Sequence, residues 1–110
     1  MKGPLNELAR EVIDVNRANG WEVLQPDDWS DQPYKVPAFL ALIHSEVSEA
    51  LEGYRHCDRE NFAEELADVV IRVLDCASGL GIDMDAEVRA KLGLERKGPN
   101  RSSSSPTFTW

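Results

Sequence analysis

The chain has 110 residues, of which 29% are charged, and its formal net charge is −8 at neutral pH. This length suits a single domain with a core of its own. The negative charge argues against a nucleic-acid binder, because such proteins neutralise phosphates with lysine and arginine. The first residues, MKGPLNELAR, are too polar for a signal peptide, and no apolar run approaches the roughly 18 residues of a membrane span. We therefore expect a cytoplasmic protein without membrane contact.

Four helices are predicted along the chain. The first covers residues 4–19, where Pro4 suits the first turn and apolar residues recur every three or four positions. The second covers about 37–57, the third begins at a cap near residue 58 or 61 and runs to about 80, and the fourth covers about 83–92. No strand alternation stands out, so the predicted fold class is all-α.

Two further segments lack a helical period. Residues 21–37, WEVLQPDDWSDQPYKVP, contain three prolines and two tryptophans and are predicted to form a loop. A loop of this length in a small domain is usually functional or disordered, and its aromatic content argues against disorder. Residues 98–110 are rich in serine and of low complexity. We expect a helical domain over 1–97 and a flexible tail over 98–110.

The second and third helices carry long apolar stripes. In the second helix the predicted buried stripe consists of Leu40, Ile43, Val47, Ala50 or Leu51, and Tyr54. In the third, one stripe is formed by Phe62, Leu66, Val69, Val73 and Ala77, and another by Ala67, Ile71 and Leu74. A helix that is apolar on two sides is central, and in so short a chain it indicates burial against a second subunit. We expect a homo-oligomer, either a dimer or a tetramer.

Acidic residues are paired on the same two helices. Glu46 and Glu49 lie three positions apart on the second helix, and Glu65 and Asp68 do so on the third. Residues at this spacing share one face of a helix, where like charges repel. A cation held between the two pairs would relieve that repulsion, and carboxylates are the hard oxygen ligands that Mg²⁺ prefers. The alternative is a solvated acidic face, opposed by arginines such as Arg72.

The arrangement of these acids resembles a known family. SExxE at residues 45–49, followed by EExxD at residues 64–68, is similar to the EExxE and ExxD signature of the MazG-like all-α nucleoside triphosphate pyrophosphohydrolases. The flanking segments LALIHSEVSEALE, FAEELADVVIRVLDCASGLGIDM and AEVRAKL also resemble that family. The likeness covers about residues 37 to 92.

This resemblance implies a small four-helix bundle that binds Mg²⁺, or alternatively Mn²⁺, through Glu46, Glu49, Glu65 and Asp68. Glu64 matches an additional acidic position and is a further candidate ligand. Members of the family hydrolyse a nucleoside triphosphate between the α and β phosphates, giving the monophosphate and pyrophosphate, and are thought to clean the nucleotide pool. The implied catalytic residues are the same four carboxylates.

Two departures from the signature suggest an alternative function. Ser45 replaces the first glutamate, and Glu95 stands where the family usually has an asparagine after Lys91. The resemblance still implies a phosphate contact for Lys91, joined by Arg96 or Lys97. The departures favour a second hypothesis, a catalytically impaired, oligomeric helical module that binds nucleotide or metal.

Other residues are candidates for contact with the substrate. Trp29, and with less support Trp21, could stack on a nucleobase or fill the end of the helical core. His44 could approach a phosphate or serve as a structural histidine. Glu52 and Asp75 are expected to be surface charges. The two cysteines, at positions 57 and 76, form no metal-binding pattern and are expected to be reduced thiols.

Overall fold

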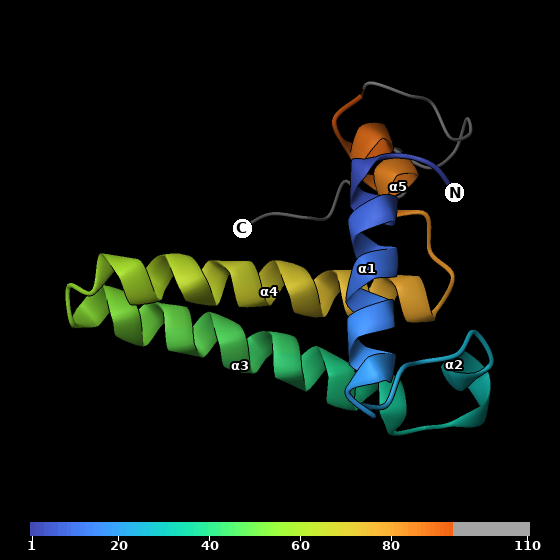
Figure 1. The fold of residues 1–110 in the computed structure, drawn as a ribbon, viewed down its shortest axis with the longest axis horizontal. Helices are drawn as coiled ribbons and strands as arrows, with labels where there is room; N and C mark the ends of the chain where they lie inside the picture. The colour runs from blue at the N-terminus through green and yellow to red at the C-terminus, as the bar shows by residue number, and fades with distance from the viewer. Residues whose placement is uncertain (94–110) are drawn as a thin grey trace, which may run out of the picture.

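The computed structural model describes residues 1–93, and within these residues the protein is all-helical, as predicted. Its five helices are α1 (Pro4–Ala18), α2 (Asp28–Asp31), α3 (Lys35–Arg55), α4 (Arg59–Gly79) and α5 (Met84–Lys91). Figure 1 shows α3 and α4 lying side by side, with α1 crossing them near the start of α3 and the end of α4. None of the described helices is long and apolar enough to cross a membrane.

The short helix α2 was not expected from the sequence, so the predicted count of four helices is wrong by one. It interrupts the segment that was predicted to be a loop. The backbone N–H of Gln25 donates to the Asp28 carboxylate at 2.8 Å, and the Lys35 ammonium lies 3.3 Å from the same carboxylate. Asp28 is buried, and these contacts join the turn to the start of α3. These tertiary contacts stabilise a helix that is too short to show a helical repeat of apolar residues in the sequence.

Helices α3 and α4 form an antiparallel hairpin with a tight connection. Cys57 occupies the left-handed region at φ 56, and the Asp58 N–H donates to the Gly53 carbonyl at 2.9 Å. The Asp58 side chain then caps α4 by accepting the Asn61 N–H at 3.0 Å. A side chain at Gly53 would place Cβ 2.9 Å from the Asn61 amide, so glycine permits the close approach of the two helices.

The core lies where α1 crosses α4. Its buried apolar residues are Ala9, Val12, Ile13, Val23, Leu24, Leu74, Cys76 and Ala77, and Ala50 is also buried on α3. Leu24, in the segment between α1 and α2, is 1% exposed and packs directly against Gly79, where a Cβ would lie 2.8 Å from the Leu24 Cβ. The expected third-helix stripes are therefore buried mainly near the end of α4. Both cysteines are free thiols, with Cys57 exposed and Cys76 buried, in agreement with the prediction.

The predicted buried stripe of the second helix is mostly exposed in the single chain. On α3, Leu40, Val47 and Leu51 are 48%, 50% and 49% exposed, and Tyr54 is 72% exposed. On α4, Leu66 is 46% exposed. The reason is visible in Figure 1, where the hairpin extends well beyond α1 and no other described helix covers its far part. The periodicity correctly marks an apolar face, but not what covers it.

Candidate functional site

Three of the predicted acidic residues meet in the hairpin. Glu46 of α3 and Glu65 and Asp68 of α4 each offer a carboxylate oxygen, and these three oxygens all lie within 4.8 Å of one another. Glu65 and Asp68 share a face of α4 because they are three positions apart. The packing of α3 against α4 then brings Glu46 to that face. All three residues are half-buried.

Within this acidic cluster the surroundings of Glu65 disfavour its negative charge. The pKa of Glu65 is raised, chiefly by desolvation and then by the hydrogen bond with Asp68. The negative charges of Asp68, Glu46 and Glu49 raise it further. Desolvation and like charges both penalise the ionised form of a carboxyl group. A cation placed among these oxygens would reverse that penalty.

One cation of the chain already contacts the cluster. The Arg72 guanidinium donates through Nε to Oε2 of Glu46 at 3.1 Å, and the Glu46 side chain is only 16% exposed. This ion pair is the kind of opposing charge expected if the acidic face were merely solvated. A metal ion at Glu46 would have to compete with it, or would use the other carboxylate oxygen.

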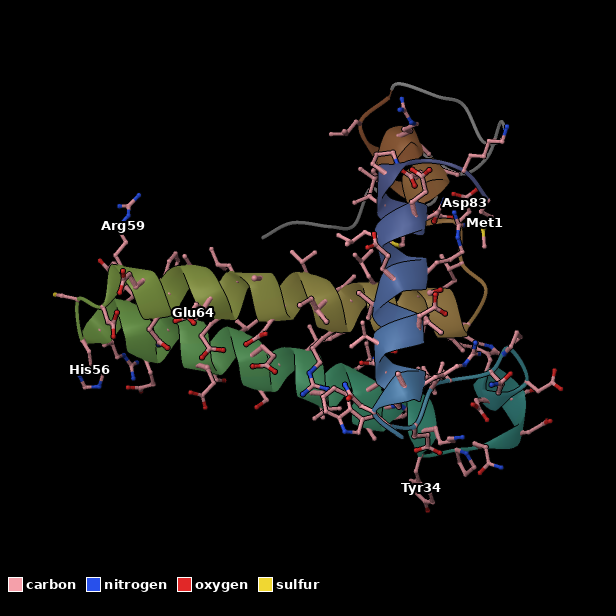
Figure 2. The ribbon with its side chains drawn as sticks, in the orientation of Figure 1. Met1, Tyr34, His56, Arg59, Glu64 and Asp83 are labelled. Atoms are coloured by element: carbon pink, nitrogen blue, oxygen red, sulfur yellow. The ribbon has the colours of Figure 1, made fainter. Side chains whose placement is uncertain are left out.

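The two remaining predicted metal ligands lie outside this group of three. Glu49 is exposed on α3, although its charge still acts on Glu65. Glu64 is exposed on α4, and Figure 2 shows it on the hairpin away from α1. Both residues remain on the helices that carry the cluster, one turn or less from it along the chain.

A cavity of about 710 Å³ adjoins the cluster. Glu46 and Asp68 form part of its wall, so the acidic oxygens and the cavity belong to one site. The other lining residues are Val12, Val15, Asn16, Trp21, Glu22, Phe39, Leu42, Ile71, Arg72 and Asp75. They come from α1, α3, α4 and the segment after α1. Apolar atoms form most of the surface of this wall, although half of the lining residues are polar or charged, and a small-molecule pocket commonly combines the two.

Asp75 is the main residue of this site that the sequence analysis missed. It was expected to be a surface charge, but it is only 4% exposed and lines the cavity. Its pKa is raised by desolvation, against the opposing effects of a hydrogen bond from Asn16 and the charge of Arg72. The sequence contained a signal for this position, because Asp75 follows Asp68 by seven residues. Two helical residues at that separation lie two turns apart on the same face. Glu52, by contrast, is exposed as expected.

The structure places one of the predicted substrate-contact residues at the cavity and the other described ones away from it. Trp21 lines the cavity, whereas Trp29 is 74% exposed and does not. His44 is exposed on α3 rather than packed as a structural histidine, and it is not part of the cavity wall. Lys91 is exposed at the end of α5 and likewise does not line the cavity. Arg96, like the expected tail over 98–110, lies outside the described residues.

The site therefore combines a carboxylate cluster, an arginine, a buried carboxyl group and an apolar wall within one concave region. Comparisons of the chain with protein-family models, with curated proteins and with solved structures found no match.

Proposed function

We propose that this protein is a Mg²⁺-dependent nucleoside triphosphate pyrophosphohydrolase of the MazG-like type. It would cleave its substrate between the α and β phosphates and release the monophosphate and pyrophosphate. The observation that carries the proposal is the position of the acidic cluster of Glu46, Glu65 and Asp68 in and beside the wall of a largely apolar cavity. The cluster is suited to a cation that meets phosphates, and the cavity to a base and sugar.

The cluster fits a magnesium ion by its chemistry and its spacing. Glu46, Glu65 and Asp68 would hold the ion, because each offers a carboxylate oxygen and these oxygens lie within 4.8 Å of one another, close enough to draw together around one cation. Mn²⁺ would suit the same oxygens. When bound, the ion supplies neutralisation of the triphosphate and a lowered pKa for a water ligand.

The chain's own groups have distinct roles in this proposal. Glu46, Glu65 and Asp68 hold the ion, with Glu49 and Glu64 as further carboxylates on the same helices. One of these glutamates accepts a proton from the water that attacks the α-phosphorus. The bond from that phosphorus to the bridging oxygen breaks, and pyrophosphate leaves with the electron pair. Arg72 lines the cavity and can turn from Glu46 toward a phosphate.

The apolar wall is the proposed place of the nucleoside. Trp21 offers an aromatic face for stacking on a base, and Phe39 and Leu42 of α3 extend the apolar surface toward Glu46. In this proposal Trp21 takes the role that the sequence analysis gave first to Trp29. Excluding water from this wall also strengthens the electrostatic interactions at the neighbouring carboxylates.

The test is product analysis on a panel of canonical and damaged nucleoside triphosphates, with Mg²⁺ and with a chelator. We expect monophosphate and pyrophosphate only when Mg²⁺ is present. Asp68→Asn should lower kcat/KM by about a hundredfold or more, because it removes a charged ligand, while circular dichroism shows unchanged helix content. Asp14→Asn, the same change on the exposed side of α1, is the matched control and should leave turnover unchanged.

Three other outcomes would each overturn the proposal in a different way. Release of orthophosphate would mean cleavage at the γ-phosphate. Absence of turnover, with nucleotide and Mg²⁺ still raising the melting temperature, would identify the catalytically impaired binding module that Ser45 and Glu95 favour. Absence of both effects would leave the carboxylates as a solvated face.

A further inference from the structure

Within residues 1–93, Arg72 is the one basic residue whose ion pair reaches the acidic cluster. Its Nε donates to Oε2 of Glu46 at 3.1 Å, and the two residues are 26 positions apart, on α4 and α3. The side chain of Glu46 is 16% exposed and that of Arg72 is 38% exposed. Water and salt screen such a pair less than they screen a pair on the open surface. The bond therefore joins a proposed metal ligand to a positive charge of the chain itself.

This arginine offsets only part of the negative charge of the cluster. Its single positive charge stands against the carboxylates of Glu46, Glu65 and Asp68. The charges that act on the Glu65 carboxyl are all negative, and they raise its pKa beyond the effect of desolvation. A divalent ion carries twice the charge of a guanidinium and can contact several of these oxygens at once. Because two cations on one carboxylate repel each other, a metal ion and Arg72 compete for Glu46.

Arg72 has a second acidic neighbour on its own helix. Asp75 follows it on α4 at a spacing that puts both residues on one face, and the charge of Arg72 opposes the desolvation that raises the Asp75 pKa. Both residues also line the cavity. A guanidinium released from Glu46 would therefore stay close to a carboxyl group and at the cavity wall. This second position makes the release less costly than the exposure of an arginine to no other acidic group.

We propose that Arg72 is a built-in counter-ion of the acidic cluster, which leaves Glu46 when a divalent metal ion binds there. In the metal-free protein Arg72 holds the Glu46 carboxylate and offsets part of the charge of the cluster. On metal binding its guanidinium turns to the cavity, which then gains a positive group. Arg72 is thus a positioning residue that acts through Glu46 and lowers the metal affinity of the site. The inference rests on the metal site of the proposed function and adds how that site is regulated.

Calorimetric titration with Mn²⁺ alone measures this competition without nucleotide or turnover. Arg72→Gln removes the competing charge, and we expect it to bind Mn²⁺ about tenfold or more tightly than the wild type does. Arg72→Lys keeps a positive charge, so its affinity should lie closer to that of the wild type. The matched control is Arg55→Gln, which removes the same charge from the exposed ion pair of Arg55 with Glu52 on α3. This control should change the affinity by less than about twofold, because that pair lies about two and a half turns along α3 from Glu46.

A second measurement follows the arginine itself. In the ¹⁵N NMR spectrum of the wild-type protein, the Nε–Hε signal of Arg72 is assigned by its loss in Arg72→Lys. We expect Mg²⁺ to shift this signal, because the hydrogen bond to Glu46 is broken, and to leave the Nε–Hε signal of Arg55 in place. Circular dichroism checks the fold of each variant, and if Arg72→Gln does not fold, this signal of the wild type decides.

The outcomes separate this inference from the function on which it rests. Equal or weaker Mn²⁺ binding by Arg72→Gln, a gain of the same size in Arg55→Gln, or an Arg72 signal that Mg²⁺ leaves unchanged overturns this inference alone. If none of the proteins binds Mn²⁺, the inference and the metal-dependent function are both overturned. If Arg72→Gln binds more tightly but no nucleotide yields pyrophosphate, the inference is supported and only the proposed function fails.

Discussion

Burial of the Asp75 carboxyl makes the stability of this fold depend on pH. Its pKa lies above the ordinary value of 3.8, because desolvation outweighs the hydrogen bond from Asn16 and the charge of Arg72. The folded protein therefore holds this proton at pH values where the unfolded chain has lost it. The resulting stabilisation is fully present below the unfolded pKa and is lost as pH rises through the folded pKa.

Asp75→Asn should remove this pH dependence, because an amide does not titrate. We expect the free energy of unfolding of the variant, relative to the wild type, to rise as pH is increased from about 4 to about 8. Urea unfolding across this range, with a chelator present to exclude metal binding, measures the difference. Asp14→Asn, which alters an exposed carboxylate, is the control. If the curves for the wild type and Asp75→Asn stay parallel, Asp75 does not titrate differently in the folded state.

At the scale of elements, α5 caps α1. The Asp85 carboxylate accepts the backbone N–H groups of Leu5 at 3.3 Å and Asn6 at 2.8 Å, which belong to the first turn of α1. The Asn6 side chain in turn donates to Asp83 at 2.8 Å and accepts the Met84 N–H at 3.0 Å. Figure 2 shows Asp83 beside the start of the chain. No side chain adjacent to α1 in the sequence caps it, so the helix depends on residues about eighty positions away.

Asp85→Ala should therefore destabilise the protein by about 1–3 kcal/mol, since it leaves two backbone donors of a buried helix end without their acceptor. Asp85→Asn keeps one oxygen and should cost less. Urea unfolding monitored by circular dichroism measures both changes. As a control, Asp14→Ala on the exposed side of α1 should change the free energy of unfolding by less than about 0.5 kcal/mol. A loss for Asp85→Ala no greater than that of the control would contradict the capping role.

At the scale of the whole molecule, the hairpin presents an apolar surface that a second copy of the chain would cover. Leu40, Val47 and Leu51 on α3 and Leu66 and Val70 on α4 are each about half exposed. Contiguous exposed apolar surface of this kind marks interfaces, and residues four or seven positions apart share a face of each helix. The expected homo-oligomer, at least a dimer, is our proposal for this surface.

Replacement of Leu51 by lysine tests the proposed assembly. A charge placed in an apolar interface must be desolvated, so Leu51→Lys should weaken dimerisation by about tenfold or more. Size-exclusion chromatography with light scattering, over a range of concentrations, gives the mass of each species. Glu52→Gln, a change at the neighbouring exposed position, should leave the assembly intact. A wild-type protein that remains a monomer at every concentration would rule the assembly out.

The sequence by itself determined every described helix except α2, and one half of the site. Periodicity placed α1, α3, α4 and α5 within a few residues of their observed bounds, because repeating apolar positions and caps are local properties of a helix. The three-residue spacing of Glu65 and Asp68 put both carboxylates on one face of α4 for the same reason. The all-α class followed from these local signals.

Only the tertiary structure decided which residues meet between elements. In the folded chain, Glu46 lies close to Glu65 and Asp68, whereas Glu49 lies outside this group. Trp21, and not Trp29, lines the cavity. The tertiary structure also buries Asp75, since the crossing of α1 over α4 covers that face, which the charge of an aspartate alone could not reveal. These outcomes depend on the packing of segments far apart in the chain, whereas a periodic pattern shows only that a face is apolar or charged and not what lies against it.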